Sequence, residues 1–174
     1  MSTTPKTEVF ATLPRRKSTD RFLISALNLN LPIITWIARR CLLRRHDNLK
    51  SGNIMPGFSF ITNRLKLAGN AALHDTKFID YSNVYIGNGA KFSFENMVIT
   101  STHDEKDFSK VISKEVHIGN NTWITSRVTI LGGSIIGDNS IIAAGSVVHG
   151  EIPPNTLAGG IPARPLRKIN VHYA

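Results

Sequence analysis

The sequence predicts an all-β solenoid, a parallel β-helix of six-residue repeats, preceded by a basic helical segment. Two columns of residues recur with a period of six. The first column holds one large aliphatic residue per repeat: Ile118, Ile124, Ile130, Ile136, Ile142 and Val148. The second column follows four residues later: Thr122, Val128, Ser134, Ser140 and Ser146. A period of six fits neither an α-helix nor a hairpin sheet, but it fits short strands that each turn one aliphatic side chain inward.

Glycine, asparagine and aspartate follow the aliphatic column, where such a coil would turn its corners, as in Gly119-Asn120 and Gly137-Asp138. These residue types tolerate the left-handed backbone that tight corners require. The same register continues upstream through Ile86, and a looser form reaches back to Leu73. We therefore expect the β-helix over residues 61–153, an N-terminal basic segment over 1–60 and a closing segment over 154–174. The two outer segments are expected to cap the ends of the coil.

One polar segment interrupts the repeat. Val98 and Ile118 are twenty residues apart, two more than a coil of three six-residue sides would need. We therefore expect residues 104–115 to project from a corner as a loop, and loops on a rigid scaffold often carry binding residues.

Basic residues are concentrated near the N-terminus. Residues 1–50 carry ten Lys and Arg against three Asp and Glu, whereas the other 124 residues carry eleven against nine. A nucleic-acid-binding domain would carry its cations on the folded body, so no nucleic-acid partner is expected. The pattern favours either a solvated basic face or contact with an anionic membrane surface. An amphipathic helix is expected from Pro32 to Arg45, because proline suits the first turn of a helix.

Two features bear on the cellular compartment of the protein: the cysteine content and the apolar stretch between Phe22 and Ala38. The single cysteine, Cys41, excludes an internal disulfide framework. The apolar stretch is interrupted by polar residues and proline, and no secretory signal is evident. We expect a cytoplasmic protein, and a location at the inner face of the membrane is left open.

Two stretches of this sequence resemble the hexapeptide-repeat acyltransferases. They are Val98 to His103 and Ile118 to Ile124, and the run from Ile152 to Arg164 resembles the closing signature of the same family. The similarity is to the branch that contains maltose and galactoside O-acetyltransferases and surface-polysaccharide acetyltransferases, over roughly residues 80–168. The resemblance implies a left-handed coil, acetyl-CoA as the donor, and a homotrimer with active sites between neighbouring subunits.

His103 is the expected general base. Transfer of an acyl group from a thioester to a hydroxyl needs a group that takes the proton of the acceptor, and histidine as a residue type titrates near neutral pH. His103 lies at the end of a repeat side, directly before the expected loop. Asp104 is adjacent, but neighbours on a strand point to opposite faces, so the group that orients His103 is left open. The other five histidines lack this placement: His46, His74, His117, His149 and His172.

The resemblance also implies the residues that contact the donor. Arginine suits phosphate recognition through charge-assisted hydrogen bonds, although a solvated basic tail is the alternative for the C-terminal cations. Ser126 is also a candidate hydrogen-bond donor near the thioester. The expected donor contacts are Trp123, Ser126, Ala144, Gly145, Arg164, Arg167 and Lys168.

The acceptor is expected to be a sugar or glycan hydroxyl. The sugar-binding residues of the galactoside enzymes do not carry over, since their positions fall near Leu73 and Tyr81; Asp80 and Tyr81 are the candidate acceptor contacts. An amino group on a nucleotide-linked sugar and a non-catalytic binding module are the alternatives. No metal is expected, because the fourteen-residue spacing of His103 and His117 does not match the ligand spacing of a γ-class carbonic anhydrase on this scaffold.

Overall fold

A computed structural model of the chain describes residues 4–29 and 31–170. His172 and the ends of the two outer segments lie outside the described residues.

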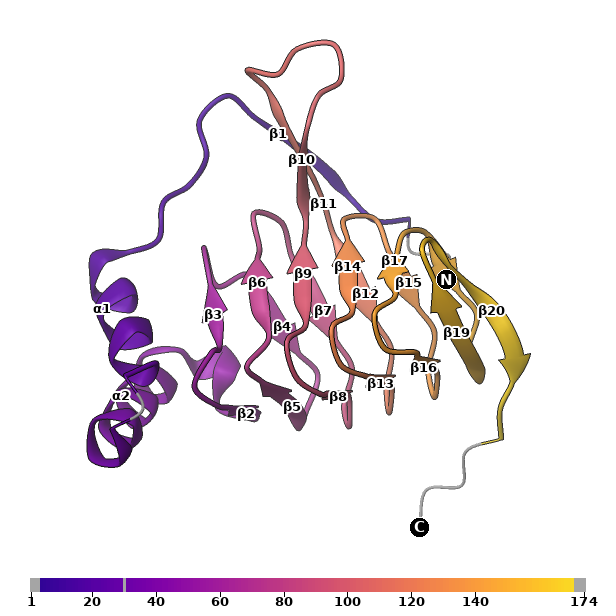
Figure 1. Cartoon of the computed structure of the whole chain (residues 1–174). Coiled ribbons are helices and arrows are strands. Elements are labelled where there is room, and N and C mark those ends of the chain that lie inside the picture. Colours follow the sequence, from indigo (N-terminus) through magenta and orange to yellow (C-terminus); the bar gives the residue numbers. More distant parts are fainter. Residues whose placement is uncertain (1–3, 30, 171–174) are drawn as a thin grey trace.

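Parallel strands coil around one core and form three sheets, visited in turn by each coil (Figure 1). Sheet 1 contains β2 (Gly52–Ile54), β5 (Ala71–His74), β8 (Lys91–Phe92), β13 (Trp123–Ile124), β16 (Ile141–Ile142), β19 (Thr156–Gly160) and β20 (Ala163–Lys168). Sheet 2 contains β3 (Ser59–Phe60), β6 (Lys77–Ile79), β9 (Met97–Ile99), β14 (Thr129–Leu131) and β17 (Val147–Val148). Sheet 3 contains β4 (Leu65–Leu67), β7 (Val84–Ile86), β12 (Val116–Ile118), β15 (Ile135–Ile136) and β18 (Glu151–Ile152).

The six-residue period is confirmed as the coil of a parallel solenoid. The aliphatic column stacks from coil to coil, with Ile118 beside Ile136 in sheet 3 and Ile124 beside Ile142 in sheet 1. These side chains are buried. The small column lies at the corners, where the Ser134 hydroxyl donates to the carbonyl of Leu131 at 2.6 Å. Thr122 and Ser146 bind the carbonyls of Gly119 and Ala143 in the same way, so three of the five small-column residues satisfy a corner carbonyl.

The solenoid begins at Gly52, earlier than the boundary expected at residue 61. Phenylalanines share the core of its first coils with aliphatic residues such as Leu65 and Leu73. Phe58 lies 6.0 Å from Phe78, and Phe78 lies 6.1 Å from Phe92, between ring centroids. Aromatic residues in the inward positions broke the aliphatic column, which is why the pattern faded in this region.

Both ends of the solenoid are capped, as expected. The helix predicted from Pro32 to Arg45 is confirmed as α2, and a second helix, α1 (Ser18–Leu27), packs against it with the short 3₁₀ helix η1 (Asp47–Leu49) beside them. Leu27, Leu42 and Leu49 are fully buried and continue the core of the first coil. At the other end, β19 and β20 pair in antiparallel fashion.

The expected loop projects from the corner between sheets 2 and 3, but its flanks are strands. β10 (Ser101–His103) and β11 (Val111–Lys114) form an antiparallel hairpin, here called the hairpin (residues 101–114). The N-terminal strand β1 (Thr7–Phe10) adds to the outer side of β11. From β1 the chain crosses above the solenoid to reach α1 (Figure 1).

Candidate active site

His103 is the last residue of β10 and is exposed on the hairpin. Its ring nitrogen Nδ1 lies 2.8 Å from the carbonyl oxygen of Phe108, across the turn at the tip. A carbonyl oxygen can only accept a hydrogen bond, so Nδ1 carries the proton. Nε2 then holds the lone pair, and it has no hydrogen-bond partner among the described residues. The geometry leaves Nε2 able to accept a proton from a substrate.

The turn that supplies this carbonyl is held by its own polar groups. Asp104 accepts a hydrogen bond from the amide of Lys106 at 2.8 Å, so its carboxylate braces the turn and is not the partner of His103. Asp107 accepts from the Ser109 hydroxyl at 2.6 Å and pairs with Lys110 at 2.9 Å. The Ser109 hydrogen bond and the Lys110 ammonium hold the pKa of Asp107 below its usual range.

The base of the hairpin is anchored by buried hydroxyls. Ser113 donates to the Thr100 carbonyl at 3.1 Å, and the Thr100 hydroxyl donates to the Ile79 carbonyl of the previous coil at 3.1 Å. The same hydroxyl oxygen accepts from the amides of Tyr81 and Ser82. These bonds tie the strand that carries His103 to the rigid coil.

Glu115 directly follows the hairpin in the chain and joins it to the N-terminal segment. Its carboxylate accepts from the Asn83 amide at 2.9 Å and from the backbone amide of Lys6 at 3.2 Å, while its own amide donates to the Lys6 carbonyl. Burial disfavours the charged carboxylate, but the Asn83 and Lys6 hydrogen bonds and nearby His117 outweigh it and hold the pKa of Glu115 below its usual range. His117 is stacked on Tyr85, at 4.6 Å between ring centroids, and this contact explains why it is half-buried.

The expected donor residues at the corner between sheets 1 and 2 do lie together. The Gly145 amide donates to the Ser126 carbonyl at 3.0 Å, so Gly145 and its exposed neighbour Ala144 sit one coil beyond Ser126. Gly145 has a left-handed φ of 71°, and a Cβ built on it would meet no described atom within 4 Å. These residues, here called the donor corner (Ser126, Ala144 and Gly145), form an open edge along the coil.

The C-terminal cations lie on β20, beside this edge. Arg164 is paired with Gly159, whose added Cβ would come within 3.0 Å of Ala143, so Arg164 lies next to the donor corner. Arg167 and Lys168 are exposed and paired with Leu157 and Thr156, further along the strand.

Trp123 lies on sheet 1, three residues before Ser126, and its contact with the donor stays a prediction. Its indole N–H donates to the Ser93 hydroxyl at 3.0 Å, and 48% of its surface is exposed. It lines a mainly apolar cavity of about 540 Å³ together with His74 and Lys91.

Asp80, one of the two candidate acceptor contacts, lies inside the coil. It is buried, and its carboxylate accepts hydrogen bonds from the amides of Ile61, Thr62 and Arg64, at 2.7, 3.1 and 2.6 Å. Burial raises the pKa of Asp80, against the effect of these donors. Three backbone donors in an enclosed turn occupy this carboxylate, which gives Asp80 a structural role; contact with the acceptor stays a prediction. Tyr81 is half-buried and lines a cleft of about 570 Å³ with Arg15 and Arg16, where its role stays a prediction.

The hairpin and the donor corner do not meet within one chain. Gly132, at the far end of the same coil as Ser126, packs under Thr100 at the base of the hairpin. The six-residue step from Ser126 to Gly132 crosses the width of sheet 2, a span of up to about 20 Å at the rise of a strand. His103 and the donor corner therefore lie on opposite edges of sheet 2.

Two features of this site had no signal in the sequence. The Phe108 carbonyl that orients His103 is a backbone group, and the alignment of β1 with β11 joins residues that are about a hundred positions apart.

Across residues 4–29 and 31–170, no group of three His, Cys, Asp or Glu side chains is placed to hold a metal ion.

Comparison with known proteins identifies the family. The family model described as "Bacterial transferase hexapeptide (six repeats)" matches residues 115–150. A galactoside O-acetyltransferase of Escherichia coli K12 is 48% identical over 68 residues, which cover 39% of this chain and 34% of that protein. The chain spans about a third to a half of the length of the curated relatives that it matches first.

Solved structures match over more of the chain. A maltose O-acetyltransferase from Clostridium difficile 630 is 30% identical, with a TM-score of 0.76, over 87% of this chain and 84% of that one. A galactoside acetyltransferase in complex with coenzyme A is 27% identical, with a TM-score of 0.72, over 87% and 79%. These likenesses confirm the expected left-handed β-helix. The chain belongs to the hexapeptide-repeat acyltransferase family.

Proposed function

We propose that this chain is an acetyl-CoA-dependent O-acetyltransferase that acts on a hydroxyl of a sugar or glycan, with His103 as general base. The observation that carries the proposal is the hydrogen bond from Nδ1 of His103 to the Phe108 carbonyl, because in the neutral ring it directs the lone pair to Nε2, on an exposed hairpin. The relatives named for galactoside and maltose support a sugar acceptor, and the coenzyme A complex supports the donor. The glycan of a surface polysaccharide is the acceptor class that we favour.

The reaction is a direct transfer. As the acceptor oxygen attacks the thioester carbonyl, its proton moves to Nε2 of His103 and a C–O bond forms. Collapse of the tetrahedral adduct breaks the C–S bond, and the thiolate of coenzyme A takes the proton back from the imidazolium. The Ser126 hydroxyl, whose oxygen already accepts from the Phe94 amide, can donate its hydrogen to the oxyanion.

Acetyl-CoA would lie along the donor corner. The open edge at Ala144 and Gly145 gives the pantetheine arm room to approach the backbone. Arg164, Arg167 and Lys168 present exposed cations for the phosphates.

We further propose a homotrimer in which each site is shared by two subunits. The placement of His103 and the donor corner on opposite edges of sheet 2 supports a site that is completed by a second subunit. Cyclic symmetry would place the hairpin of one subunit against the donor corner of the next, and three such contacts close a ring.

A coenzyme A release assay tests the function. The panel contains free sugars, glycan fragments and nucleotide-linked amino sugars, so that O- and N-acetylation are distinguished. His103→Ala is expected to lower kcat by roughly 10²- to 10⁴-fold, the usual contribution of a general base. Glu105→Ala, an exposed change on the same hairpin, is the matched control and should retain activity. Equal turnover by wild type and His103→Ala would rule out the mechanism.

A further inference from the structure

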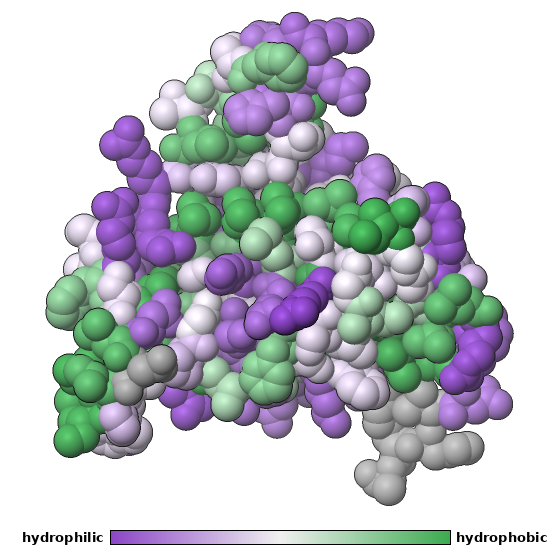
Figure 2. Space-filling view, in the orientation of Figure 1, coloured by the Kyte–Doolittle hydropathy of each residue, from purple (hydrophilic) through white to green (hydrophobic). Residues whose placement is uncertain are grey.

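The helical cap presents a group of large apolar side chains that remain 39–75% exposed. Figure 2 shows the apolar side chains gathered over the cap formed by α1 and α2. Ile33 is 75% exposed, Phe22 72% and Trp36 59%. The other large apolar residues exposed there are Leu29, Leu31, Ile34 and Ile37. We call these seven residues the apolar tip. An exposed cluster of this kind marks a contact surface and is not required by the fold of the cap.

The buried core of the cap is formed by other residues than those of the apolar tip. α2 turns Ala38 and Leu42 inward, and both are buried against the solenoid and α1. Ile33, Trp36 and Ile37 follow one another at helical spacing on the opposite face. The same face continues into Arg40 and Arg44, which are exposed. One face of α2 is therefore apolar near its start and cationic near its end.

The charge of this region is strongly one-sided. Residues 15–45 contain eight Lys and Arg against one acid, Asp20. Asp20 is buried and already bound by Arg45 and His46, each at 2.9 Å. Arg40 lies over the ring of Trp36, 5.3 Å from its centroid, so a cation and an amphipathic aromatic residue are held side by side. A second copy of this surface would repel it, whereas anionic headgroups would neutralise it.

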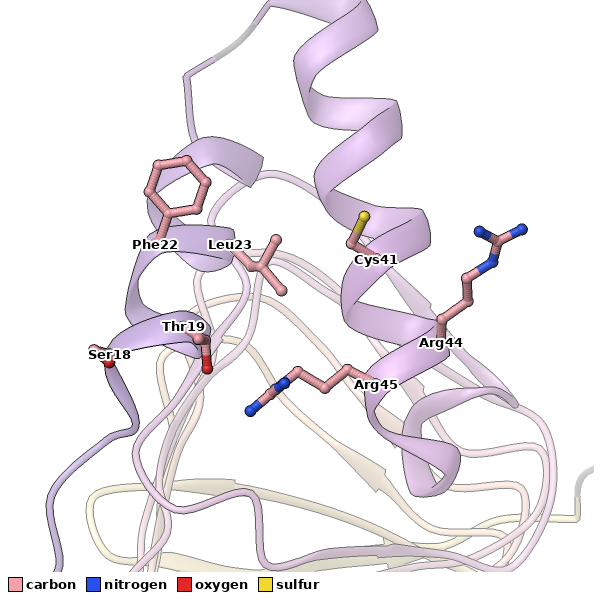
Figure 3. Close-up of a pocket in the computed structure, with 7 residues that line it drawn as sticks. All are labelled: Ser18, Thr19, Phe22, Leu23, Cys41, Arg44 and Arg45. Carbon is pink, nitrogen blue, oxygen red and sulfur yellow. The ribbon is translucent and has the colours of Figure 1, made fainter.

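A cleft between the two helices links the apolar and cationic parts. It has a volume of about 730 Å³ and is lined by Phe22, Leu23 and Cys41, with Arg44 and Arg45 beside them. Figure 3 shows Leu23 pointing from α1 toward α2, while Arg45 reaches back toward the start of α1. Apolar groups and guanidinium groups thus share one opening.

We propose that the cap docks on the surface of a bilayer that contains anionic phospholipid. Ile33 and Arg40 are about 10 Å apart along α2, at a helical rise of about 1.5 Å per residue. The start of α2 would meet the bilayer first, so that the apolar tip enters the headgroup boundary to the roughly 5–10 Å that interfacial apolar groups reach, while Arg40 and Arg44, further along the helix, stay at the phosphates. Tryptophan beside arginine is typical of this boundary. The helices of residues 4–29 and 31–170 include none that could cross a membrane.

Docking at one end of the solenoid would suit an enzyme that modifies a membrane-carried glycan. If the proposed trimer holds, three caps related by one rotation axis face the same plane, and binding becomes multivalent. The docking itself does not rest on the enzymatic proposal, since it follows from the cap of one chain.

Co-sedimentation of the full chain with vesicles tests the proposal, without any substrate. Wild type should bind vesicles of phosphatidylcholine with phosphatidylglycerol, bind poorly to phosphatidylcholine alone, and release as salt is raised. Arg40→Gln/Arg44→Gln should weaken binding by roughly tenfold or more. Lys66→Gln/Lys77→Gln removes the same charge from the exposed faces of sheets 3 and 2 and should leave binding unchanged.

The double variant Ile33→Asn/Trp36→Gln tests the apolar tip and should also reduce vesicle binding. Its thermal unfolding temperature, measured by circular dichroism, should match that of wild type because both residues are exposed. Coenzyme A release with a soluble acceptor should persist in every variant, which separates docking from catalysis. Absence of wild-type binding would overturn the proposal. Binding to duplex DNA that equals binding to the anionic vesicles would also overturn it. The same holds if the apolar variant changes its oligomeric state while its vesicle binding is unchanged.

Discussion

Gly132 shows how one residue sets the position of the hairpin. A Cβ added there would lie 2.5 Å from the Thr100 carbonyl oxygen and 3.2 Å from that of Lys114, the two residues at the feet of the hairpin. Both contacts are to backbone, which cannot rotate away. Gly132→Ala should therefore destabilise the fold by about 1–3 kcal/mol and also lower kcat, because the hairpin must shift.

Gly87→Ala is the matched control for this prediction. Its added Cβ would meet backbone of Gly119 and Asn120 at 2.5 Å, on a corner away from the hairpin. Thermal unfolding should report a loss in both variants, and kcat of the folded protein should fall for Gly132→Ala alone. An equal loss of kcat in the two would contradict the positioning role.

At the scale of elements, Glu115 links β1, the hairpin and sheet 3, and its pKa is held low in the folded chain. A carboxylate with a lowered pKa stabilises the fold above its ordinary pKa, and that contribution is lost as the pH falls. The free energy of unfolding of wild type should exceed that of Glu115→Gln by about 2 kcal/mol near neutral pH. The difference should shrink as the pH drops below about 4.

Denaturant unfolding across this pH range measures the effect. Glu95→Gln is the control, because Glu95 pairs with Arg127 at 2.6 Å but both side chains are exposed. Exposed pairs contribute little, so this variant should match wild type within about 0.5 kcal/mol. A difference for Glu115→Gln that does not change with pH would contradict the assignment of its charge.

At the scale of the whole molecule, the proposed sharing of each site predicts complementation between inactive variants. His103→Ala lacks the base, and Ala144→Trp fills the donor corner at an exposed position. If each site takes its base from one subunit and its donor corner from the next, random mixed trimers should recover about a quarter of the wild-type activity.

Co-expression with two affinity tags, followed by coenzyme A release, measures this recovery. Co-expressed copies of His103→Ala under both tags provide the background. No recovery in the mixed trimers would place the whole site within one chain and rule out the shared arrangement.

The sequence by itself determined the coil and the place of His103 on it. The six-residue period decided the solenoid from Ile86 to Ile152, because each repeat settles locally which side chain turns inward. The break in that period located the projecting segment, and His103 was visible at its edge. The helix from Pro32 to Arg45 was equally local, since the proline at its start signals it.

The tertiary structure decided what depends on backbone groups and distant segments. The tautomer of His103 is set by the Phe108 carbonyl, which no side-chain pattern encodes. Asp80, a candidate acceptor contact, lies enclosed by the turn of the previous coil, sixteen to nineteen residues earlier. Long-range packing also places β1 on the hairpin and sets His103 and the donor corner on opposite edges of one sheet. Periodicity fixes which residues face inward, whereas the contacts between coils fix what each exposed group can reach.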